Sequence, residues 1–344
     1  MNTKDQEQWY DLRHGKHRLF CKKMEHLIEE LVSSNDIHVH SITSRVKEKN
    51  SFLKKCELKQ YQHMEEITDI VGVRIITPIL EDVDKVCELI KKEFTIDDGN
   101  SGDKLAALKS NEMGYLSVHY IAQLGSSREN LPEYCQYKSI VFEIQVRTLL
   151  QHAWAEITHD SSYKFSGTLP SEIDRHFHLA AGTLELIDRE FQRLSDELST
   201  YKNNVVHDIQ EGKLQIEINS TSLKEYLAEK LSDDMITDRH FNGYDEIIIQ
   251  ELRDFDIDTI KALDLIVSPM LEKHTRRLAN KTYLGFLRDT MIISDAETYF
   301  KNSWKRDWVV LSSDDYDALK ALGVDVEGIV ARYDLDIFDN KLSQ

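Results

Sequence analysis

Apolar and polar positions along residues 7–159 repeat at intervals that predict alternating helices and strands. Apolar side chains recur every three or four residues in the predicted helices, whereas the predicted strands alternate or form short apolar runs. The predicted helices cover residues 7–33, 50–60, 81–94 and 148–159, and the predicted strands cover residues 37–47, 70–77, 115–124 and 140–147. A polar loop is predicted at 95–113. This order, with its βαβ-like unit, predicts an α/β (α+β) fold.

A further helix is predicted after Pro170, and its apolar side chains recur at alternating steps of four and three residues. Such spacing forms a heptad-like seam. The seam consists of Ile173, Phe177, Ala180, Leu184, Ile187, Phe191, Leu194 and Leu198. Two interpretations stay open: the seam docks on the preceding domain, or it pairs with another copy of the chain in a homo-oligomer.

The pattern changes character beyond residue 200. Helices are predicted at 222–231, 257–274, 283–304 and 314–322, and strands at 214–218 and 308–311. We therefore divide the chain into a domain at 1–200 and a mainly helical α+β accessory region at 201–344. Acidic side chains outnumber basic ones by 28 to 18 in the accessory region. The default interpretation is that this acidic excess keeps the protein soluble. The alternative is that an acidic segment of the accessory region covers a basic site of the first domain.

Composition indicates a folded protein, because 344 residues with 41% hydrophobic side chains can bury a large core. The four cysteines stand far apart without a CxxC pair, which argues against a zinc knuckle or a disulfide framework. The first ten residues are polar, and no apolar run approaches the ~18 residues of a membrane span. We expect a cytoplasmic protein that does not contact the membrane.

The formal charge of −18 argues against a general nucleic-acid coat protein. Residues 41–60 are an exception, since they hold six basic and two acidic side chains. A phosphate site would explain this segment, and a solvated basic helix face explains it equally well. Ser51 lies near a predicted helix N-terminus with Lys55 a turn later, an arrangement that suits a polyphosphate.

Three predicted strands carry polar faces, because side chains two residues apart share a face. The groups are Arg45 with Lys47, Tyr115 with Ser117 and His119, and Glu143 with Gln145 and Arg147. Burying such groups without a partner would be costly. The pattern therefore predicts a polar ligand.

Asp69 offers a second carboxylate beside Glu143, and two carboxylates facing phosphates are a usual means of holding Mg²⁺. Strict alternation would put Asp69 and Arg74 on opposite faces, so we expect a departure at Gly72. His152 and Glu156 share a helix face, but no third His or Cys stands near at ligand spacing. We predict no transition metal there.

Four ordered motifs together resemble the synthetase domain of the RelA/SpoT family. They read IHVHSITSRVKEKNSFLKK, ITDIVGVRIIT, GYLSVHY and FEIQVRTLLQHAWAEITHDSSYK, and the resemblance covers about 35–200. It implies a nucleotidyltransferase-like mixed sheet flanked by helices. It also implies Mg²⁺-dependent transfer of pyrophosphate from ATP to the 3′-hydroxyl of GDP or GTP, which makes the stringent-response alarmone (p)ppGpp.

The resemblance also implies residue roles. ATP would be held by Arg45, Lys47, Ser51, Lys55 and Arg74. Asp69 would bind Mg²⁺, and Glu143 would be either a second Mg²⁺ ligand or the base. The acceptor nucleotide would be held by Tyr115, stacked on guanine, with His119, Gln145 and Arg147.

This chain departs from the family at Leu116, where an arginine usually stands after GY. Toxic relatives move pyrophosphate onto the 3′ end of tRNA and are restrained by an antitoxin or an attached domain, which keeps tRNA open as the acceptor. The lack of an extended basic segment beyond 41–60 argues against tRNA. The pair His159–Asp160 lies within the matched region and His207–Asp208 follows it, whereas the family's hydrolase domain precedes the synthetase, so we expect no alarmone hydrolase activity.

Overall fold

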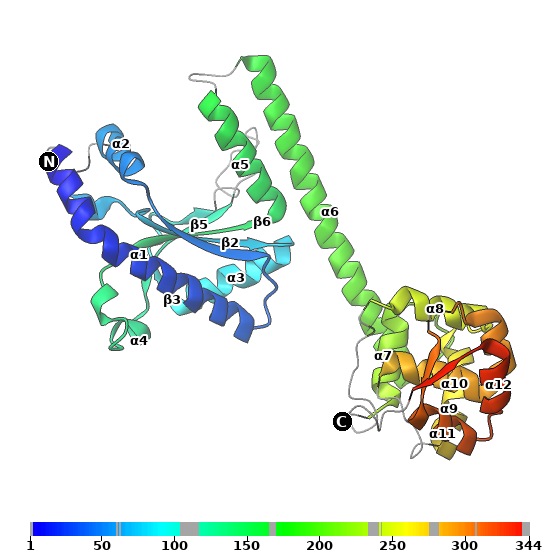
Figure 1. Ribbon diagram of the computed structural model, residues 1–344. Coiled ribbons are helices and arrows are strands. Elements are labelled where there is room, and N and C mark those ends of the chain that lie inside the picture. The colour runs from blue at the N-terminus through cyan, green and yellow to red at the C-terminus, as the bar shows by residue number, and fades with distance from the viewer. Residues whose placement is uncertain are drawn as a thin grey trace. The chain divides into compact units, whose positions relative to one another are not determined.

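The computed structural model describes residues 3–59, 61, 63–103, 117–164, 170–232, 241, 243–274, 282–306 and 308–338. The chain forms two compact units, Met1–Asp196 and Glu197–Gln344 (Figure 1). Among the described residues, no helix is both long and apolar enough to cross a membrane. All four cysteines are free thiols, and only Cys135 is exposed.

Six strands of the described residues form one mixed sheet in the first unit, in the order β1-β2-β6-β5-β3 with β4 beside β5. They are β1 (Ser41–Val46), β2 (Val71–Thr77), β3 (Phe94–Ile96), β4 (Gly102–Asp103), β5 (Val118–Leu124) and β6 (Phe142–Thr148). Only β2 and β6 run parallel. The expected mixed sheet is confirmed. The strand predicted at 37–47 begins at Ser41, and two short strands occupy the predicted loop.

Helices flank this sheet (Figure 1). They are α1 (Thr3–Ser34), α2 (Lys49–Lys59), α3 (Leu80–Glu93), α4 (Ser126–Glu129) and α5 (Leu149–Lys164), with 3-10 turns at Met64–Glu66 and Cys135–Tyr137. The long helix α6 (Ser171–Gln210) follows α5, and its residues from Glu197 on belong to the second unit. The main core joins apolar side chains of α1 and α3 to one face of the sheet, including Phe20, Ile90 and Ile144. The alternation in β6 follows from this packing, because Phe142, Ile144 and Val146 are fully buried while the residues between them face away.

A capping box turns strand β6 directly into helix α5. Thr148 Oγ1 accepts a hydrogen bond from Gln151 N at 3.1 Å, and Gln151 Oε1 accepts one from Thr148 N at 2.9 Å. The Thr148 hydroxyl also donates to Asp188 Oδ2 of α6 at 2.6 Å. One threonine therefore ends the strand, starts the helix and holds α6 against the domain.

The second unit is mainly helical. It contains α7 (Ser220–Lys230), α8 (Asp245–Asp254), α9 (Ile260–His274), α10 (Tyr283–Thr298), a π turn (Tyr299–Ser303), β7 (Val310–Ser312), α11 (Ser313–Ala321), α12 (Val326–Tyr333) and β8 (Asp336–Phe338). β7 and β8 pair in parallel. The expectation of a mainly helical α+β region is confirmed, although α8, α12 and β8 have no counterpart among the predicted elements.

Two predicted elements of the second unit are wrong in detail. The strand predicted at 214–218 is an extended segment with a single bridge between Glu217 and Thr259, because its partner is the short turn that precedes α9. Its alternation reflects burial of Ile218 on the helical core. The helix predicted at 283–304 is interrupted at Asp295, whose backbone (φ −157°, ψ 92°) is not helical.

Candidate active site

The strand register aligns two rows of side chains across four strands on the face opposite the main core. One row contains Thr43, Arg74, Gln145 and His119. The next contains Arg45, Gly72, Glu143 and Ile121. Directly opposed residues share a face, so polar groups from segments far apart in the sequence meet here.

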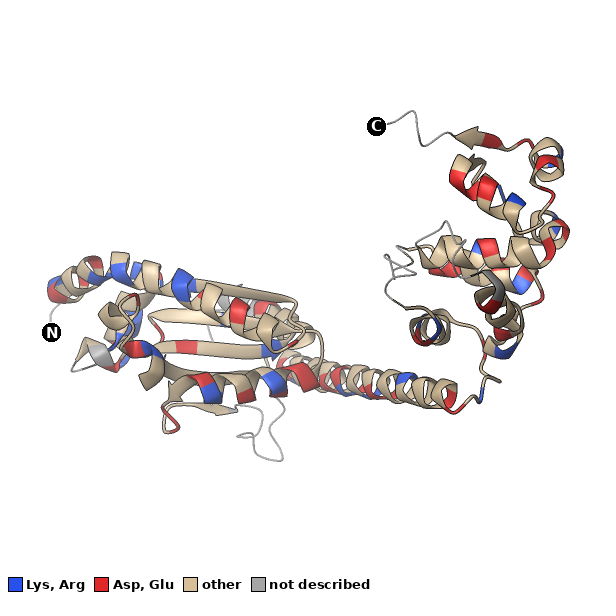
Figure 2. Ribbon diagram, turned by 90° about the horizontal axis from the view of Figure 1, so that it is seen from below, with Lys and Arg blue, Asp and Glu red and all other residues tan. Residues whose placement is uncertain are grey.

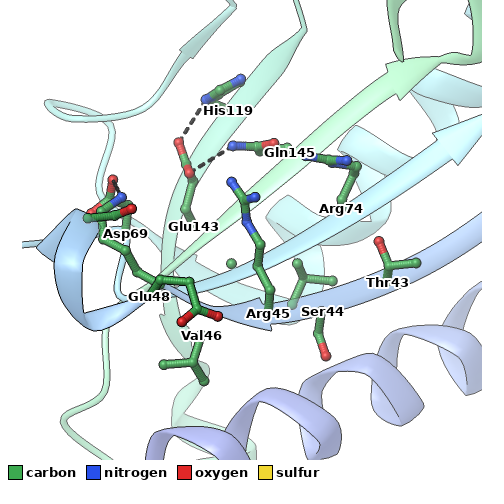
Figure 3. A pocket seen from close by; sticks show the side chains of 14 residues that line it. Thr43, Ser44, Arg45, Val46, Glu48, Asp69, Arg74, His119, Glu143 and Gln145 are labelled. Carbon is green, nitrogen blue, oxygen red and sulfur yellow. Dashed lines mark hydrogen bonds and ion pairs between the residues drawn. The ribbon is translucent and has the colours of Figure 1, made fainter. Parts of the chain in front are cut away.

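These rows form the floor of a pocket of about 640 Å³ (Figure 3). It is lined by eight of the predicted residues: Arg45, Lys47, Ser51, Asp69, Arg74, His119, Glu143 and Gln145. Thr43, Ser44, Glu48 and Gly72 also line it and were not predicted. A Cβ added at Gly72 would meet no atom within 4 Å, so this glycine leaves the floor open between Arg45 and Glu143.

Asp69 lies in a turn before β2 and is held by two lysines. Its Oδ2 accepts from Lys47 Nζ at 2.9 Å and from Lys55 Nζ at 2.7 Å. Its Oδ1 is buried without a hydrogen-bond partner among the described residues. The expected departure from alternation at Gly72 is wrong, because Gly72 keeps regular register and Asp69 precedes the strand.

The Asp69 carboxylate is ionised. Burial alone would raise its pKa, but hydrogen bonds from Lys55 and Lys47 outweigh burial and lower the pKa below the ordinary value. An ionised carboxylate with one buried, unbonded oxygen has an incomplete set of partners. A cation would complete it.

Glu143 is held by its neighbours in the sheet. His119 Nδ1 lies 2.7 Å from Oε1, and Gln145 Nε2 donates to Oε2 at 2.9 Å. Burial raises the pKa of Glu143. The interactions with His119 and the hydrogen bond from Gln145 together outweigh burial, so the pKa of Glu143 lies below its ordinary value. Since an ionised carboxylate only accepts, Nδ1 is the donor. The second ring nitrogen of His119 lies 2.7 Å from Ser117 Oγ.

Asp69 and Glu143 are close enough to influence one another, because the charge on Asp69 raises the pKa of Glu143. Within the described part of the chain, no three or more His, Cys, Asp or Glu side chains are grouped to hold a metal ion. The pair of carboxylates Asp69 and Glu143 suits Mg²⁺, which keeps several waters and binds substrate phosphate oxygens. The residues therefore fit the expected ion.

Three arginines make the other end of the site positive. Burial, then the charges on Arg74 and Arg45, lower the pKa of Arg147 to about 10. Arg147 is only 4% exposed, and its Nη2 lies 3.4 Å from Gln145 Oε1 beneath the pocket. Such mutual repulsion between guanidinium groups would be relieved by a bound polyanion.

Glu156 of α5 partly offsets this charge. Its Oε1 lies 3.0 Å from Arg74 Nη1 and 3.7 Å from His152 Nδ1. Burial and the charges on Arg147 and Arg74 lower the pKa of His152, so the imidazole is neutral near pH 7. The structure thus makes Glu156 a partner of Arg74, a contact that helix periodicity could not reveal.

Some predicted residues have a different position. Tyr115 and Leu116 lie outside the described residues. Lys55 and Arg147 do not line the pocket themselves. Lys55 contacts the pocket residue Asp69, and Arg147 contacts the pocket residue Gln145. Tyr10 of α1 fixes the end of β1, because its hydroxyl donates to the Lys47 carbonyl at 2.7 Å; sequence patterns gave no signal for this contact.

Comparison with known proteins places this site in a family. The family profile described as "Region found in RelA / SpoT proteins" matches residues 44–168. The chain is 30% identical over 177 residues to GTP pyrophosphokinase YjbM of Bacillus subtilis (strain 168), covering 50% of this chain and 80% of that protein. The chain belongs to the RelA/SpoT family. This confirms the resemblance inferred from the four motifs.

A second relative of the RelA/SpoT family, GTP pyrophosphokinase YwaC of the same organism, is 29% identical over 173 residues, covering 48% of this chain and 79% of that protein. The crystal structure of small alarmone synthetase 1 from Bacillus subtilis matches with 26% identity and a TM-score of 0.47 over 56% of this chain and 98% of that one. The same enzyme bound to its product pppGpp matches with 27% identity and a TM-score of 0.46 over the same shares.

Proposed function

We propose that this protein is a cytoplasmic, Mg²⁺-dependent GTP diphosphokinase that transfers pyrophosphate from ATP to the 3′-hydroxyl of GDP or GTP. The names of the two curated relatives support the reaction class. The observation that carries the proposal is that one cation-rich pocket holds both Glu143 and Asp69, whose buried Oδ1 has no hydrogen-bond partner in the part of the chain that the structure describes. Such a pocket suits phosphoryl-group transfer, where positioning and charge neutralisation dominate catalysis.

The donor nucleotide would lie over β1 and β2. Arg45 and Arg74 would contact its phosphates from neighbouring rows, and Ser51 would contact it from the first turn of α2. Lys47 and Lys55 act partly through Asp69, whose position they hold. Asp69 would hold Mg²⁺, which when bound neutralises charge on the phosphate oxygens of ATP.

We assign the base to Glu143. Its lowered pKa keeps it ionised, so it can take the proton from the attacking 3′-hydroxyl as that oxygen bonds to the β-phosphorus of ATP and AMP leaves. His119 and Gln145 each occupy one of its oxygens and so fix its orientation. The alternative role as a second Mg²⁺ ligand is distinguishable, because excess Mg²⁺ would then partly restore a Glu143→Gln variant.

The acceptor would lie toward β5 and β6. His119, Gln145 and Arg147 would position it, and Tyr115 would stack on its guanine, as the family resemblance implies. Such contacts would put the 3′-hydroxyl next to Glu143, because His119 and Gln145 both hydrogen-bond to that carboxylate. Holding both nucleotides in line accounts for much of the rate enhancement in such a reaction.

The test is an incubation with Mg²⁺ and γ-labelled ATP, offering GDP, GTP and bulk tRNA in separate reactions, with Glu143→Gln as the control. Label on GDP or GTP that depends on Glu143 is the expected result. Label on tRNA alone would replace the proposal with the alternative acceptor, which Leu116 keeps open. Against that alternative, basic and acidic residues are interleaved along the described helices of both units (Figure 2).

A further inference from the structure

Arg74 contacts both the pocket and the helix beside it. It lies on the pocket floor, in the row between Thr43 of β1 and Gln145 of β6 (Figure 3). Its Nη1 donates to Glu156 Oε1 of α5 at 3.0 Å, whereas Glu156 itself does not line the pocket. A guanidinium group has five N–H donors, so this one bond uses only part of the capacity of Arg74. The carboxylate of α5 and a phosphate in the pocket would therefore share one cation.

The position of Glu156 is set by the junction of β6 and α5. The capping box of Thr148 and Gln151 starts α5 directly from the strand, and Glu156 follows eight residues after Thr148. Eight residues make a little over two helical turns, about 12 Å along the axis. From there the carboxylate reaches Arg74 on β2, the parallel neighbour of β6.

Glu156 is the carboxylate that Arg74 contacts in a cluster of arginines. Besides burial, which has the largest effect, Arg74 and Arg45 lower the pKa of Arg147, while Glu156 and Glu143 raise it. Both oxygens of Glu143 are already held by other side chains. Glu156 therefore neutralises part of the charge that a bound phosphate would otherwise meet in full.

The Arg74–Glu156 pair can open at low cost. The Glu156 side chain is 57% exposed, compared with 23% for Arg74. One oxygen contacts one nitrogen, without the two parallel bonds of a bidentate pair. His152 Nδ1 lies 3.7 Å from the same oxygen, which is too far for a hydrogen bond. Exposed pairs with a single contact are weak, so a polyanion at Arg74 can displace the carboxylate into water.

We propose that Glu156 sets the affinity of the pocket for ATP by competing with the donor phosphates for Arg74. This rests on the proposed function in one respect, that ATP is the nucleotide bound over β1 and β2. A phosphate that takes the Arg74 guanidinium must displace the carboxylate, and that displacement costs binding free energy. The cost is the same for bound ATP and for the transition state, so it weakens ATP binding without lowering kcat. Glu156 is an affinity-determining residue, not a catalytic one.

The first test titrates the full chain with an ATP analogue, in the presence of Mg²⁺ and without acceptor, and reads Kd by calorimetry. A methylene group in the analogue replaces the oxygen between the α- and β-phosphorus atoms, where the proposed reaction breaks the bond. Glu156→Gln keeps the size and the accepting oxygen but loses the charge. It should lower Kd by about three- to fivefold, the size expected for an exposed ion pair.

Glu185→Gln is the matched control for this titration. It removes a carboxylate that pairs with Arg189 Nη2 at 2.6 Å on α6, and it should leave Kd unchanged. An unchanged or raised Kd in Glu156→Gln would overturn the proposal. If Glu156 served only to orient Arg74, Glu156→Ala would raise Kd, a result that would also overturn it.

The second test asks whether the effect passes through Arg74. In an Arg74→Gln background, Glu156→Gln should no longer lower Kd, because the carboxylate has no guanidinium for which to compete. A decrease of the same size in that background would show that the charge of Glu156 acts on the nucleotide independently of Arg74. That result would refute the competition.

Binding of the analogue by the native chain also tests the donor site itself. If the native chain does not bind it, the donor site is absent and the proposed function fails together with the role of Glu156. If the native chain and Glu156→Gln bind it equally tightly, the donor site stands and only the role of Glu156 fails. Because no acceptor is present, the titration does not depend on which acceptor the enzyme uses.

Discussion

His119 Nδ1 lies 2.7 Å from Glu143 Oε1, and the contact joins β5 to β6 across the centre of the pocket. It keeps the carboxylate ionised and fixes one of its two oxygens. Gln145 fixes the other from the same strand. Glu143 is thus oriented by its own sheet before any substrate arrives, a form of preorganisation that catalysis favours.

Replacing Glu143 with Gln should lower kcat by about 100-fold or more, because an amide cannot take the proton from the 3′-hydroxyl. Affinity for ATP should change little, since the proposed donor site lies over β1 and β2. Initial rates and ATP titration by calorimetry measure both. Glu129→Gln, which breaks only a surface pair with Lys138, is the control and should leave both unchanged. Full activity of Glu143→Gln would refute the assignment.

Asp69→Asn should raise the Mg²⁺ concentration needed for half-maximal rate by about tenfold or more, because the variant loses the negative charge proposed to bind the ion. The rate measured against Mg²⁺ concentration reports this. Asp11→Asn is a matched control, since Asp11 also pairs with a lysine, Lys49 at 2.8 Å, but is exposed and does not line the pocket. An identical Mg²⁺ dependence in Asp69→Asn and the native protein would argue against Asp69 as the ligand.

Gly72→Val should raise KM for ATP by about tenfold while the protein stays folded. Valine suits a strand, and the space above Gly72 is empty, so the side chain would fill the pocket floor rather than strain the sheet. The magnitude corresponds to about 1.4 kcal/mol of lost binding. Gly15→Ala in α1 is the control: it should add about 0.5–1 kcal/mol of stability without changing KM. An unchanged KM in Gly72→Val would exclude ATP from this part of the floor.

Stability should fall as pH drops from about 6.5 toward 4, in part because of His17 of α1. Burial, with the nearby charges of Arg13 and Lys16, lowers its pKa from 6.5 to about 4. Below about pH 6.5 the unfolded chain therefore binds a proton at His17 that the folded chain does not bind. The free energy of unfolding falls by about 3 kcal/mol by pH 4 for this reason. Denaturant unfolding at several pH values measures it. His17→Leu should reduce the pH dependence, and a slope equal to that of the native protein would contradict the explanation.

Arg288→Met should destabilise the second unit by about 3–5 kcal/mol, because Glu251 would remain buried without its main cationic partner. Glu251 is 2% exposed and accepts from Arg288 Nε at 3.0 Å and from the Tyr299 hydroxyl at 3.1 Å. Thermal unfolding reports the change. Arg253→Met breaks an exposed pair with Glu217 and should cost less than about 1 kcal/mol. Equal destabilisation by Arg288→Met and Arg253→Met would show that burial of the Arg288–Glu251 pair does not increase the cost of breaking it.

The sequence by itself determined the main helices and strands of the first unit, but not the short β3, β4 and α4, and it determined the composition of the polar strand faces. Helical and strand periods follow from local geometry, so residues such as Glu143 and Gln145 must share a face wherever β6 is placed. The family also followed from motifs that are local in sequence. Which of the pocket residues bind nucleotide stays a prediction.

Only the tertiary structure decided which strands are neighbours and in what register, because these depend on pairing between distant segments. That pairing brings Arg45, Gly72 and Glu143 into one row and puts Glu156 of α5 against Arg74. It also showed that α6 docks through Asp188 beside its apolar seam. Helix periodicity identifies an apolar side, but the partner that covers it is set by packing of the whole chain or of another copy.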